Sequence, residues 1–380
     1  MSDAPVSRDV LSLFGDDDQT PVERAIAEMR AGRAVLIEHE DGVFAVTGAE
    51  FACDDLLAGL KQTSSGEVSM ILSGARLRFL GSAAGQQPHA IDAAGLTPAE
   101  IDDLMRKPDL ELTQPLLPAG PAAEAALALL RLALLLPSAL IARVSTESAA
   151  TLNAVRVSSS AVQRYAETRR KTVSIVSRAP VPLFTARDTE FVVFRGGEGL
   201  REQIAIIVGK PDAAEPVPVR LHSACITGDL FGSLRCDCGD QLRGAVKMMA
   251  EQGGGVLLYL DQEGRGNGIA NKIRAYCLQY QGLDTYEADE ALGLGADNRS
   301  FEFAAEMLRQ IGYNKVSLLT NSPEKATALR RAGIEVADTQ RVHGRLNSEN
   351  VGYLTAKRDR AGHLVDPGAP QTDTLAPAAE

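Results

Sequence analysis

Apolar and polar positions in the first part of the chain follow two different periods, which predict alternating helices and strands. A helix is expected after Thr20, because Thr caps helices, Pro21 suits a first helical turn, and apolar residues then recur at helical spacing. The short apolar run at 34–38 follows a turn and predicts a buried strand. A longer apolar stretch predicts a helix at Ala122–Leu136 and a strand at Ala139–Val144.

From about residue 175 onward, short apolar runs alternate with amphipathic stretches. The strand-like runs lie at 203–209, 219–223, 255–260, 315–319 and 334–336. Helical periodicity marks Gln241–Gln252, Asn271–Gln281, Ser300–Ile311 and Pro323–Ala332. This order predicts an α/β fold of the α+β type, with mixed sheets, flanking helices and two domains.

The stretches between these patterns divide the chain. We expect a flexible tail at 1–19, a first domain at 20–145, a polar linker at 146–174, a second domain at 175–365 and a flexible tail at 366–380. The 380 residues are enough for two domains, and 45% of them are hydrophobic while 23% are charged, as in globular proteins.

Charge and hydropathy narrow the range of partners. The formal net charge of −11 argues against a nucleic-acid-binding surface that covers the whole molecule, but not against a small basic pocket for an anionic metabolite. The N-terminal stretch lacks the basic and apolar regions of a secretion signal, and Arg131 and Pro137 interrupt the longest apolar run. We therefore expect a cytoplasmic protein without nucleic-acid or membrane partners, in which grouped thiols favour a metal over a disulfide.

Three of the five cysteines lie close together in the sequence, at Cys225, Cys236 and Cys238. Thiolate suits zinc, and an extended strand would turn the last two side chains to one face. The other two cysteines are poor candidates for a fourth ligand. The spacing therefore predicts one zinc ion per chain with an open position, where zinc lowers the pKa of bound water to about 7. Two alternatives stay open: His222 completes a closed structural site, or the thiols are free and buried.

Three turns that precede helices carry groups suited to binding anions. The stretch "DQEGRGNGIANKIRAY" at 261–276 brings glycines and basic side chains to a helix start. The stretches "TNSPEK" at 320–325 and "GADNRS" at 295–300 carry a lysine and an Asp–Arg pair. Each one alone fits an ordinary turn, a helix cap or a surface ion pair equally well. Together with a zinc site, they predict hydrolysis of a phosphorylated small molecule.

These stretches resemble the GTP cyclohydrolase II family. The resemblance rests on three motifs in order, at 219–242, 258–301 and 318–329, and extends over about 175–363. It implies a zinc-dependent hydrolase that converts GTP to 2,5-diamino-6-ribosylamino-4(3H)-pyrimidinone 5′-phosphate, formate and pyrophosphate, the first committed step of riboflavin biosynthesis. It also implies Mg²⁺ bound with the substrate triphosphate, and a homodimer.

The resemblance assigns roles to individual residues. The three clustered cysteines correspond to the zinc ligands, and water attacks C8 of the guanine ring. Asp297 is implied as the proton acceptor, Arg299 as a nucleophile at the α-phosphate, and Tyr276 as a neighbour of the opening ring. A purely electrostatic role for Arg299 is the alternative. The implied nucleotide-binding residues are Arg220, Leu221, His222, Ser223, Ala224, Gln241, Glu263, Gly264, Arg265, Thr285, Thr320 and Lys325.

Four positions depart from the family pattern. Ala224 stands where glutamate is frequent, and Asp261 stands where arginine is frequent. If those two side chains normally face each other, loss of one favours loss of the other. Asn267 and Asn298 replace a common apolar residue and a common acid. The first two changes motivate a second hypothesis, a related nucleotide hydrolase with an altered substrate or incomplete ring opening.

The first domain resembles 3,4-dihydroxy-2-butanone 4-phosphate synthase more faintly, at 25–41 and 116–144. The acidic stretch that should follow the first strand is missing, and so is the Gly-His-Thr-Glu motif before the later helix. Because that chemistry needs acids to hold magnesium and move protons, the resemblance implies a degenerate domain without this activity. This degeneracy motivates a third hypothesis, a non-catalytic zinc-containing nucleotide sensor or scaffold.

Overall fold

The computed structural model describes residues 15–169, 173–197, 199–295 and 297–364. The expected tail at 366–380, and all but the end of the tail at 1–19, lie outside the described residues. The chain forms two compact units: unit 1 is Met1–Glu167 with Glu287–Ala296, and unit 2 is Thr168–Tyr286 with Asp297–Glu380. Unit 1 thus includes a short segment whose neighbours in sequence belong to unit 2, a division that the apolar pattern does not indicate.

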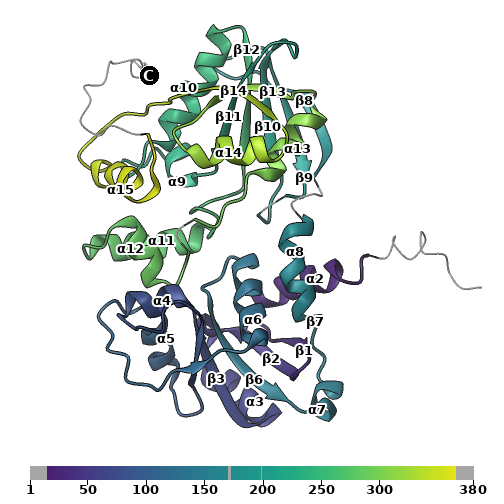
Figure 1. Cartoon of the computed structure of the whole chain (residues 1–380), viewed down its shortest axis with the longest axis vertical. Coiled ribbons are helices and arrows are strands. Elements are labelled where there is room, and N and C mark those ends of the chain that lie inside the picture. The colour runs from purple at the N-terminus through teal and green to yellow at the C-terminus, as the bar shows by residue number, and fades with distance from the viewer. Residues whose placement is uncertain (1–14, 170–172, 198, 296, 365–380) are drawn as a thin grey trace, which may run out of the picture. The chain divides into compact units, whose positions relative to one another are not determined.

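Unit 1 is built on a seven-stranded sheet with the strand order β5-β4-β3-β6-β2-β1-β7. Figure 1 labels β3, β6, β2, β1 and β7 of this sheet. All neighbouring strands pair antiparallel except β1 and β7, which are parallel. The strands are β1 Val35–His39, β2 Gly42–Gly48, β3 Ser64–Leu72, β4 His89–Asp92, β5 Leu117–Pro118, β6 Ser138–Val144 and β7 Arg156–Ser158.

The helices of unit 1 agree with the apolar pattern where the stripe is long. The apolar stretch predicted as a helix to Leu136 ends at Leu132, and Leu134 takes a left-handed conformation with φ of 58° before Pro137. The stretch expected as a linker carries two helices and β7. The helices are α2 Gln19–Arg30, η2 Ala49–Phe51, α3 Asp54–Thr63, α4 Gly74–Phe79, α5 Pro98–Arg106, α6 Pro121–Leu132, α7 Thr146–Thr151 and α8 Ser159–Arg169.

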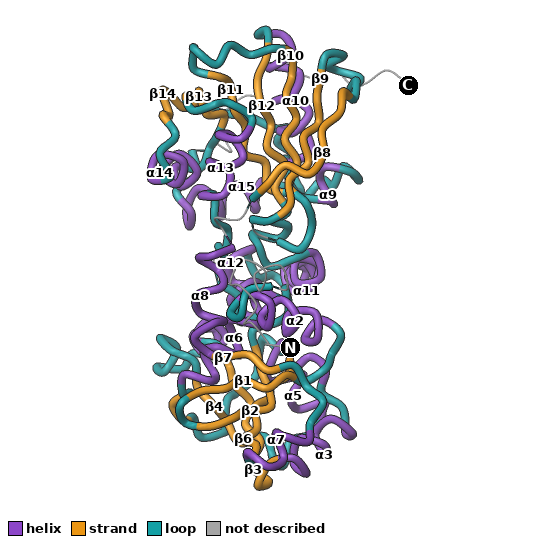
Figure 2. Tube along the Cα trace, turned by 90° about the vertical axis from the view of Figure 1, so that its right-hand side faces the viewer, coloured by secondary structure: helices purple, strands orange, loops and turns teal. Residues whose placement is uncertain are grey.

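Unit 2 is built on a second seven-stranded sheet, with the order β14-β13-β11-β12-β10-β9-β8 (strands orange in Figure 2). Strands β8, β9, β10 and β12 pair antiparallel, and β12, β11, β13 and β14 pair parallel. The strands are β8 Ser174–Pro180, β9 Thr189–Arg195, β10 Gln203–Gly209, β11 Val217–Ser223, β12 Gly254–Leu260, β13 Lys315–Leu319 and β14 Glu335–Gln340.

Helices cover both faces of the unit 2 sheet. One face packs its apolar side chains against Phe303 and Leu308 of α13 and Leu329 of α14, and the other packs against Val246 and Met249 of α10. The central strands therefore appear in the sequence as continuous apolar runs. The helices are α9 Ile226–Asp229, α10 Cys238–Glu251, α11 Ile269–Tyr280, α12 Thr285–Ala291, α13 Glu302–Gln310, α14 Pro323–Arg331 and α15 Val351–Ala361.

These two units confirm the predicted fold class of mixed sheets with flanking helices. Parallel strands β11, β12 and β13 lie side by side in unit 2, so their carboxyl ends meet at one edge of the sheet. Loops after such ends are the usual place for ligand sites. Within the described residues, no helix has the length and apolar character needed to cross a membrane.

Candidate active site

Three thiols come together just beyond the carboxyl end of β11. Cys225 follows that strand, and Cys236 and Cys238 return at the start of α10. Their sulfur atoms all lie within 4.8 Å of one another, and the Sγ atoms of Cys225 and Cys236 are 3.6 Å apart. The sequence prediction that these cysteines form one group is thus realised, in a geometry that suits a soft divalent metal.

The local reason for this convergence differs from the predicted one. Cys236 and Cys238 do not lie on an extended strand, because Asp237 is the N-cap of α10 and Cys238 is its first residue. Gly228 of α9 fits between the thiols, where a Cβ would lie 2.7 Å from Cys236 Sγ and 3.2 Å from Cys225 Sγ. The tight turn through α9 therefore needs glycine at this position.

His222 does not complete the group of three cysteines. Its Nε2 lies 3.0 Å from an Asp229 carboxylate oxygen, and among the described residues no histidine or carboxylate joins the thiols. Asp229 also accepts hydrogen bonds from Tyr259 Oη and from the Cys225 amide. The buried His222–Asp229 pair thus braces the turn behind the thiols, and within the described residues the group offers three side chains that could hold a metal, the number typical of catalytic zinc sites.

The electrostatics of the thiol group favour one thiolate before any metal binds. Hydrogen bonds from Cys236 and Cys238, and the charge of Lys272, hold the pKa of Cys225 far below its ordinary value. The hydrogen bond between Cys225 and Cys236 raises the pKa of the Cys236 thiol to about 11. A metal that binds all three as thiolates therefore displaces protons from the other two.

Lys272 on α11 is a neighbour of the thiols that the residue assignments above do not include. Its Nζ donates to Cys225 Sγ at 3.1 Å and to Glu263 Oε1 at 2.6 Å, and the other carboxylate oxygen of Glu263 accepts from the Ile226 amide. Burial lowers the pKa of Lys272, but Cys225 and Glu263 raise it above its ordinary value. The sequence contains a signal that could have indicated this lysine. Lys272 and Tyr276 are four residues apart in a predicted helix and therefore lie on the same helix face.

Tyr276 lies on the same side of the thiols as Lys272. Arg235 lies over its ring with Cζ 5.4 Å from the centroid, and Lys272 Nζ is 5.9 Å from that centroid. Burial raises the pKa of the Tyr276 hydroxyl, while Lys272 and a hydrogen bond with Thr227 oppose that rise. A neutral phenol is therefore available as a hydrogen-bond donor.

Asp297 and Arg299 form an ion pair that reaches the end of β11. Arg299 Nε donates to Asp297 Oδ1 at 2.9 Å, and Arg299 Nη1 donates to Ser223 Oγ at 3.2 Å. Ser223 in turn donates to Gln262 Oε1 at 3.0 Å. Burial raises the pKa of Asp297, but the hydrogen bonds and charge of Arg299 outweigh it and lower the pKa. Asp297 is therefore a carboxylate that can accept a proton.

Two further cations lie buried beside this pair. Arg220 on β11 is 6% exposed and donates to the Leu319 carbonyl and to Gln241, which in turn donates to Asp237. Lys325 is 7% exposed, and its Nζ donates to the Leu221 carbonyl at 2.7 Å. Burial, followed by the charges of Arg299 and Arg220, lowers the pKa of Lys325. A buried excess of positive charge of this kind favours an anion.

The glycine-rich loop packs against the segment that carries the ion pair. Gly264 has φ of 61°, and a Cβ there would meet the Gly268 carbonyl at 2.8 Å. The Asn298 amide donates to the Arg265 carbonyl at 3.2 Å, and Asn298 Nδ2 donates to Asn267 Oδ1 at 2.7 Å. The two asparagines noted as departures from the family pattern thus form a hydrogen bond with each other. Because Asn298 lies between Asp297 and Arg299, this bond connects the loop to the ion pair.

Asp261 also has partners of its own. Its carboxylate accepts from the amides of Leu200 and Arg201 at 2.9 and 3.0 Å, and a Cβ on Gly199 would lie 2.5 Å from that carboxylate. Ala224 donates its amide to the Leu260 carbonyl at 2.8 Å. Asp261 therefore anchors the loop before β10.

Of the remaining predicted residues, one lies in a turn, one at a helix start and one in the glycine-rich loop. Thr320 Oγ1 accepts from the Ser322 amide at 3.0 Å in the turn before α14, and Thr285 begins α12. The guanidinium of Arg265, a residue with φ of 58°, lies over Tyr286 at 4.2 Å from the ring centroid.

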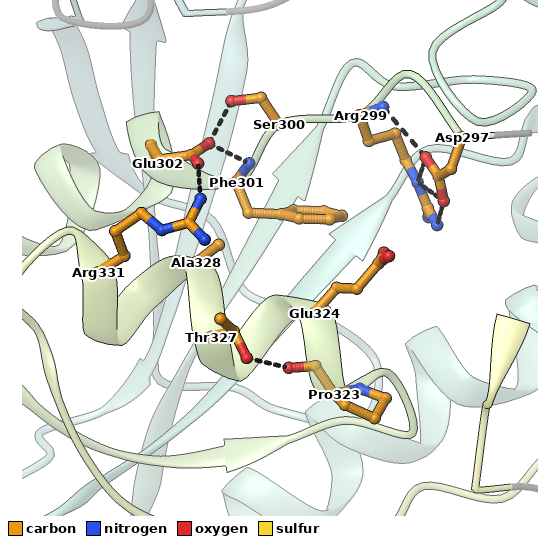
Figure 3. A pocket seen from close by; sticks show the side chains of 10 residues that line it. All are labelled: Asp297, Arg299, Ser300, Phe301, Glu302, Pro323, Glu324, Thr327, Ala328 and Arg331. Carbon is orange, nitrogen blue, oxygen red and sulfur yellow. Dashed lines mark hydrogen bonds and ion pairs between the residues drawn. The ribbon is translucent and has the colours of Figure 1, made fainter. Parts of the chain in front are cut away.

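A cavity of about 390 Å³ opens beside the ion pair (Figure 3). Phe301 lies in its wall, with Arg299 Cζ 5.4 Å and Lys325 Nζ 5.1 Å from the ring centroid. Glu302 in the wall accepts hydrogen bonds from Ser300 and Phe301 (Figure 3). The lining residues are Asp297, Arg299, Ser300, Phe301, Glu302, Pro323, Glu324, Thr327, Ala328 and Arg331. The cavity thus borders the Asp297–Arg299 pair, which is predicted to act near the substrate phosphates, and none of the three thiols lines it.

Comparisons with known proteins agree on one family. The GTP cyclohydrolase II family matches residues 174–342. The chain is 43% identical over 367 residues to a GTP cyclohydrolase-2 of Xylella fastidiosa, covering 93% of this chain and 89% of the relative. It is 41% identical over 360 residues to a GTP cyclohydrolase-2 of Azospirillum brasilense, covering 90% and 93%.

Among solved structures, a two-domain 3,4-dihydroxy-2-butanone 4-phosphate synthase of A. baumannii, RibBX, aligns with 85% of this chain and 99% of its own. The TM-score is 0.33 and the identity is 18%, values too low to compare residues. The two relatives above match this chain across both units, and the family match covers the thiols and the Asp297–Arg299 pair. The chain therefore belongs to the GTP cyclohydrolase II family.

Proposed function

We propose that this protein hydrolyses GTP to 2,5-diamino-6-ribosylamino-4(3H)-pyrimidinone 5′-phosphate, formate and pyrophosphate, as the first step of riboflavin biosynthesis. The observation that carries the proposal is the arrangement around β11. Three thiols follow the strand, and its last residue, Ser223, accepts a hydrogen bond from Arg299 of the Asp297–Arg299 pair. One strand end thus serves both ring opening and phosphate chemistry.

The donor set fits zinc, at one ion per chain. Cys225, Cys236 and Cys238 would hold it, since three soft thiols lie close enough to share one ion. When bound, zinc supplies Lewis acidity that activates water for attack at C8 of guanine. Mg²⁺ would accompany the substrate triphosphate, as the family resemblance implies.

Individual residues of the chain then have separate roles. Asp297 accepts a proton, because its carboxylate stays ionised beside Arg299. Arg220, Arg299 and Lys325 form the cationic end of the site, which suits the triphosphate. Tyr276 contributes a neutral hydroxyl on the side of the thiols, where the opening ring would lie. The other nucleotide contacts would come from the strand-end and loop positions named in the sequence analysis.

A second candidate function rests on the altered loop positions. The Asn267–Asn298 hydrogen bond and the Asp261 anchor replace the side chains frequent in the family. An enzyme with this loop could act on a different nucleotide or stop before the ring is fully opened. The same product analysis separates this candidate from the first.

Assembly and location belong to the proposal as well. We expect a homodimer, as the family resemblance implies, and a location in the cytoplasm, where thiols stay reduced. We also expect unit 1 to contribute no synthase reaction of its own, because the short β1–β2 connection leaves no room for the missing acidic stretch.

The deciding experiment incubates zinc-loaded protein with GTP and Mg²⁺ and identifies every product. We expect formate, pyrophosphate and the pyrimidinone phosphate in equal amounts. Release of pyrophosphate without formate, or turnover only of another nucleotide, would favour the second candidate. Full formate release by a zinc-free Cys236→Ser protein would refute the role of the thiols, with Cys277→Ser as the control, because Cys277 is an exposed cysteine of α11.

A further inference from the structure

The segment that leads into the C-terminal helix α15 packs beside the thiols. A Cβ on Gly344 would lie 2.5 Å from the Cβ of Asp237, the N-cap residue of α10 that separates two of the cysteines. Arg345 donates Nε and Nη2 to the Asp240 carboxylate in the first turn of α10, each at 3.0 Å. The path into α15 is therefore fixed at the helix start where these two cysteines lie.

The other end of α15 meets the turn before α14. Just past the end of α15, the Leu364 amide donates to the Asn321 carbonyl at 3.0 Å. The turn and the helix start that follows it carry Thr320 and Lys325, which the family resemblance implies as nucleotide-binding residues. A helix of 11 residues is about 16 Å long. Helix α15 thus extends from the thiols to the cationic part of the site, and it lies beyond the residues 174–342 that the family matches.

Tyr353 marks the thiol end of α15. Burial, followed by the charges of Cys238, Cys236 and Asp237, raises the pKa of its hydroxyl. Charges act in this way only over short separations, because the Coulomb energy falls with distance. Lys357 lies one helical turn further along α15, with Nζ 4.2 Å from the centroid of the Tyr353 ring. The ring therefore holds the ammonium beside the site.

The ammonium of Lys357 has no anionic partner among the residues that the structure describes. By contrast, Arg358 and Arg360 on the same helix both pair with carboxylates. Lys357 is also half-buried, so water reaches only part of its side chain. Its three N–H donors are therefore available to a ligand.

Lys357 adds to a concentration of positive charge. Burial, the charges of two arginines and then that of Lys357 lower the pKa of Lys325. Burial, followed by the charges of Lys357 and of two further cations of the site, lowers the pKa of His363 to about 3. Asp297 opposes both shifts, but it is already paired with Arg299. The excess of positive charge favours a ligand with several negative charges.

We propose that Lys357 is a further binding residue of the site and contacts the β- and γ-phosphates of GTP. This inference rests on the proposed function, which supplies the nucleotide. The guanine ring would lie at the thiols and the α-phosphate at Arg299, as the family resemblance implies. Lys357 lies on the part of α15 that leads from the thiols toward Thr320 and Lys325, so the outer phosphates are those within its reach.

The test compares Lys357→Gln with the wild type, both as zinc-loaded full chains. Calorimetry measures the Kd for inorganic pyrophosphate and for GMP, each with Mg²⁺, and steady-state kinetics measures KM and kcat for GTP. We expect the Kd for pyrophosphate and the KM for GTP to rise about 10–100-fold, the usual effect of losing one hydrogen bond to a charged group. The Kd for GMP, which lacks the outer phosphates, should stay near the wild-type value, as should kcat and zinc content.

Two further variants serve as references. Lys357→Arg keeps the positive charge and the N–H donors, so it should retain most of the affinity for pyrophosphate. Lys210→Gln removes an exposed lysine just after β10, at the end of the sheet where β12 begins, and should leave every value unchanged.

An unchanged Kd for pyrophosphate in Lys357→Gln would overturn the inference. An equal loss of affinity for GMP and pyrophosphate would overturn it as well, because it would indicate a general effect on the fold. If the wild type does not open GTP but its affinity for pyrophosphate depends on Lys357, the proposed function fails and the phosphate contact stands. Opening of GTP with the same KM in both proteins has the opposite meaning.

Discussion

Lys272 connects the glycine-rich loop to the thiols through a direct contact with Cys225 and an ion pair with Glu263. Three thiolates around a divalent ion leave a net negative charge, which one buried ammonium offsets. The lysine therefore acts as an outer partner of a metal ligand, and such partners affect metal affinity without touching the metal.

Substituting Lys272 by Gln should lower zinc affinity about 10–100-fold, because the thiols would be harder to ionise. Without the lysine the pKa of Cys225 rises, so the loss should be largest at low pH and shrink as the pH rises and the thiols ionise in both proteins. Competition with a chelator measures the affinity. Lys247→Gln, at an exposed lysine of α10 paired with Glu251, is the matched control. Equal affinity of Lys272→Gln and wild type would contradict the prediction.

Two roles are considered for Arg299: a nucleophile at the α-phosphate, or a charge that stabilises the phosphates electrostatically. Burial lowers its pKa, but the hydrogen bond and charge of Asp297 raise it above the ordinary value for arginine. A guanidinium that keeps its proton has no free electron pair for attack. The contacts at the site therefore favour the electrostatic role.

On this basis, Arg299→Ala should slow pyrophosphate release by about 100–1,000-fold, and Arg299→Lys should slow it less, because a point charge at the same place replaces part of the stabilisation. Zinc content should remain at one ion per chain in both proteins. A lysine variant as slow as the alanine variant would instead support the nucleophilic role.

Sequence patterns predicted the central strands of unit 2 well because those strands are buried on both faces. Runs such as Gln203–Gly209 are apolar throughout, and the structure has β10 at the same residues. The pattern failed where the signal was local and ambiguous. Cys236 and Cys238 fit a strand or a helix start equally well, and the short polar strand β7 resembles a linker until it pairs with β1.

The candidate site was predictable in part for a similar reason. Cysteines are rare in this chain, so their spacing alone indicated a group. The contacts of Lys272 with Cys225, and of Asn298 with Asn267, join residues from separate turns, and spacing along the sequence carries no information on such pairs.

The turn through α9 provides a test of how the thiols are spaced. Gly228→Ala should place a methyl group against Cys236 Sγ and separate the thiols, so zinc content should fall well below one ion per chain while the fold persists. Gly244→Ala in α10 is the control, because a Cβ there meets nothing within 4 Å. Full zinc occupancy in Gly228→Ala would show that the turn can relax around the extra carbon.

Unit 1 retains a complete sheet, but its first two strands form a short hairpin. His39 pairs with Gly42, so only Glu40 and Asp41 connect β1 to β2. We predict that the protein does not convert ribulose 5-phosphate to the four-carbon phosphate with Mg²⁺. The two-residue connection has no room for the acidic stretch whose side chains would hold the metal. Detection of that product by mass spectrometry, at a rate dependent on Mg²⁺, would contradict this prediction.

The passage of the chain into unit 1 at 287–296 also bears on how such a protein can change during evolution. Because unit 1 is made of two separate stretches of sequence, no single cut divides the chain into its two units. A gene that lost the first stretch would leave Ala288, Leu292 and Leu294 without the packing that buries them. Fission would therefore need compensating changes in this segment at the same time, and a first unit without a reaction of its own, as predicted above, can be retained for that reason alone.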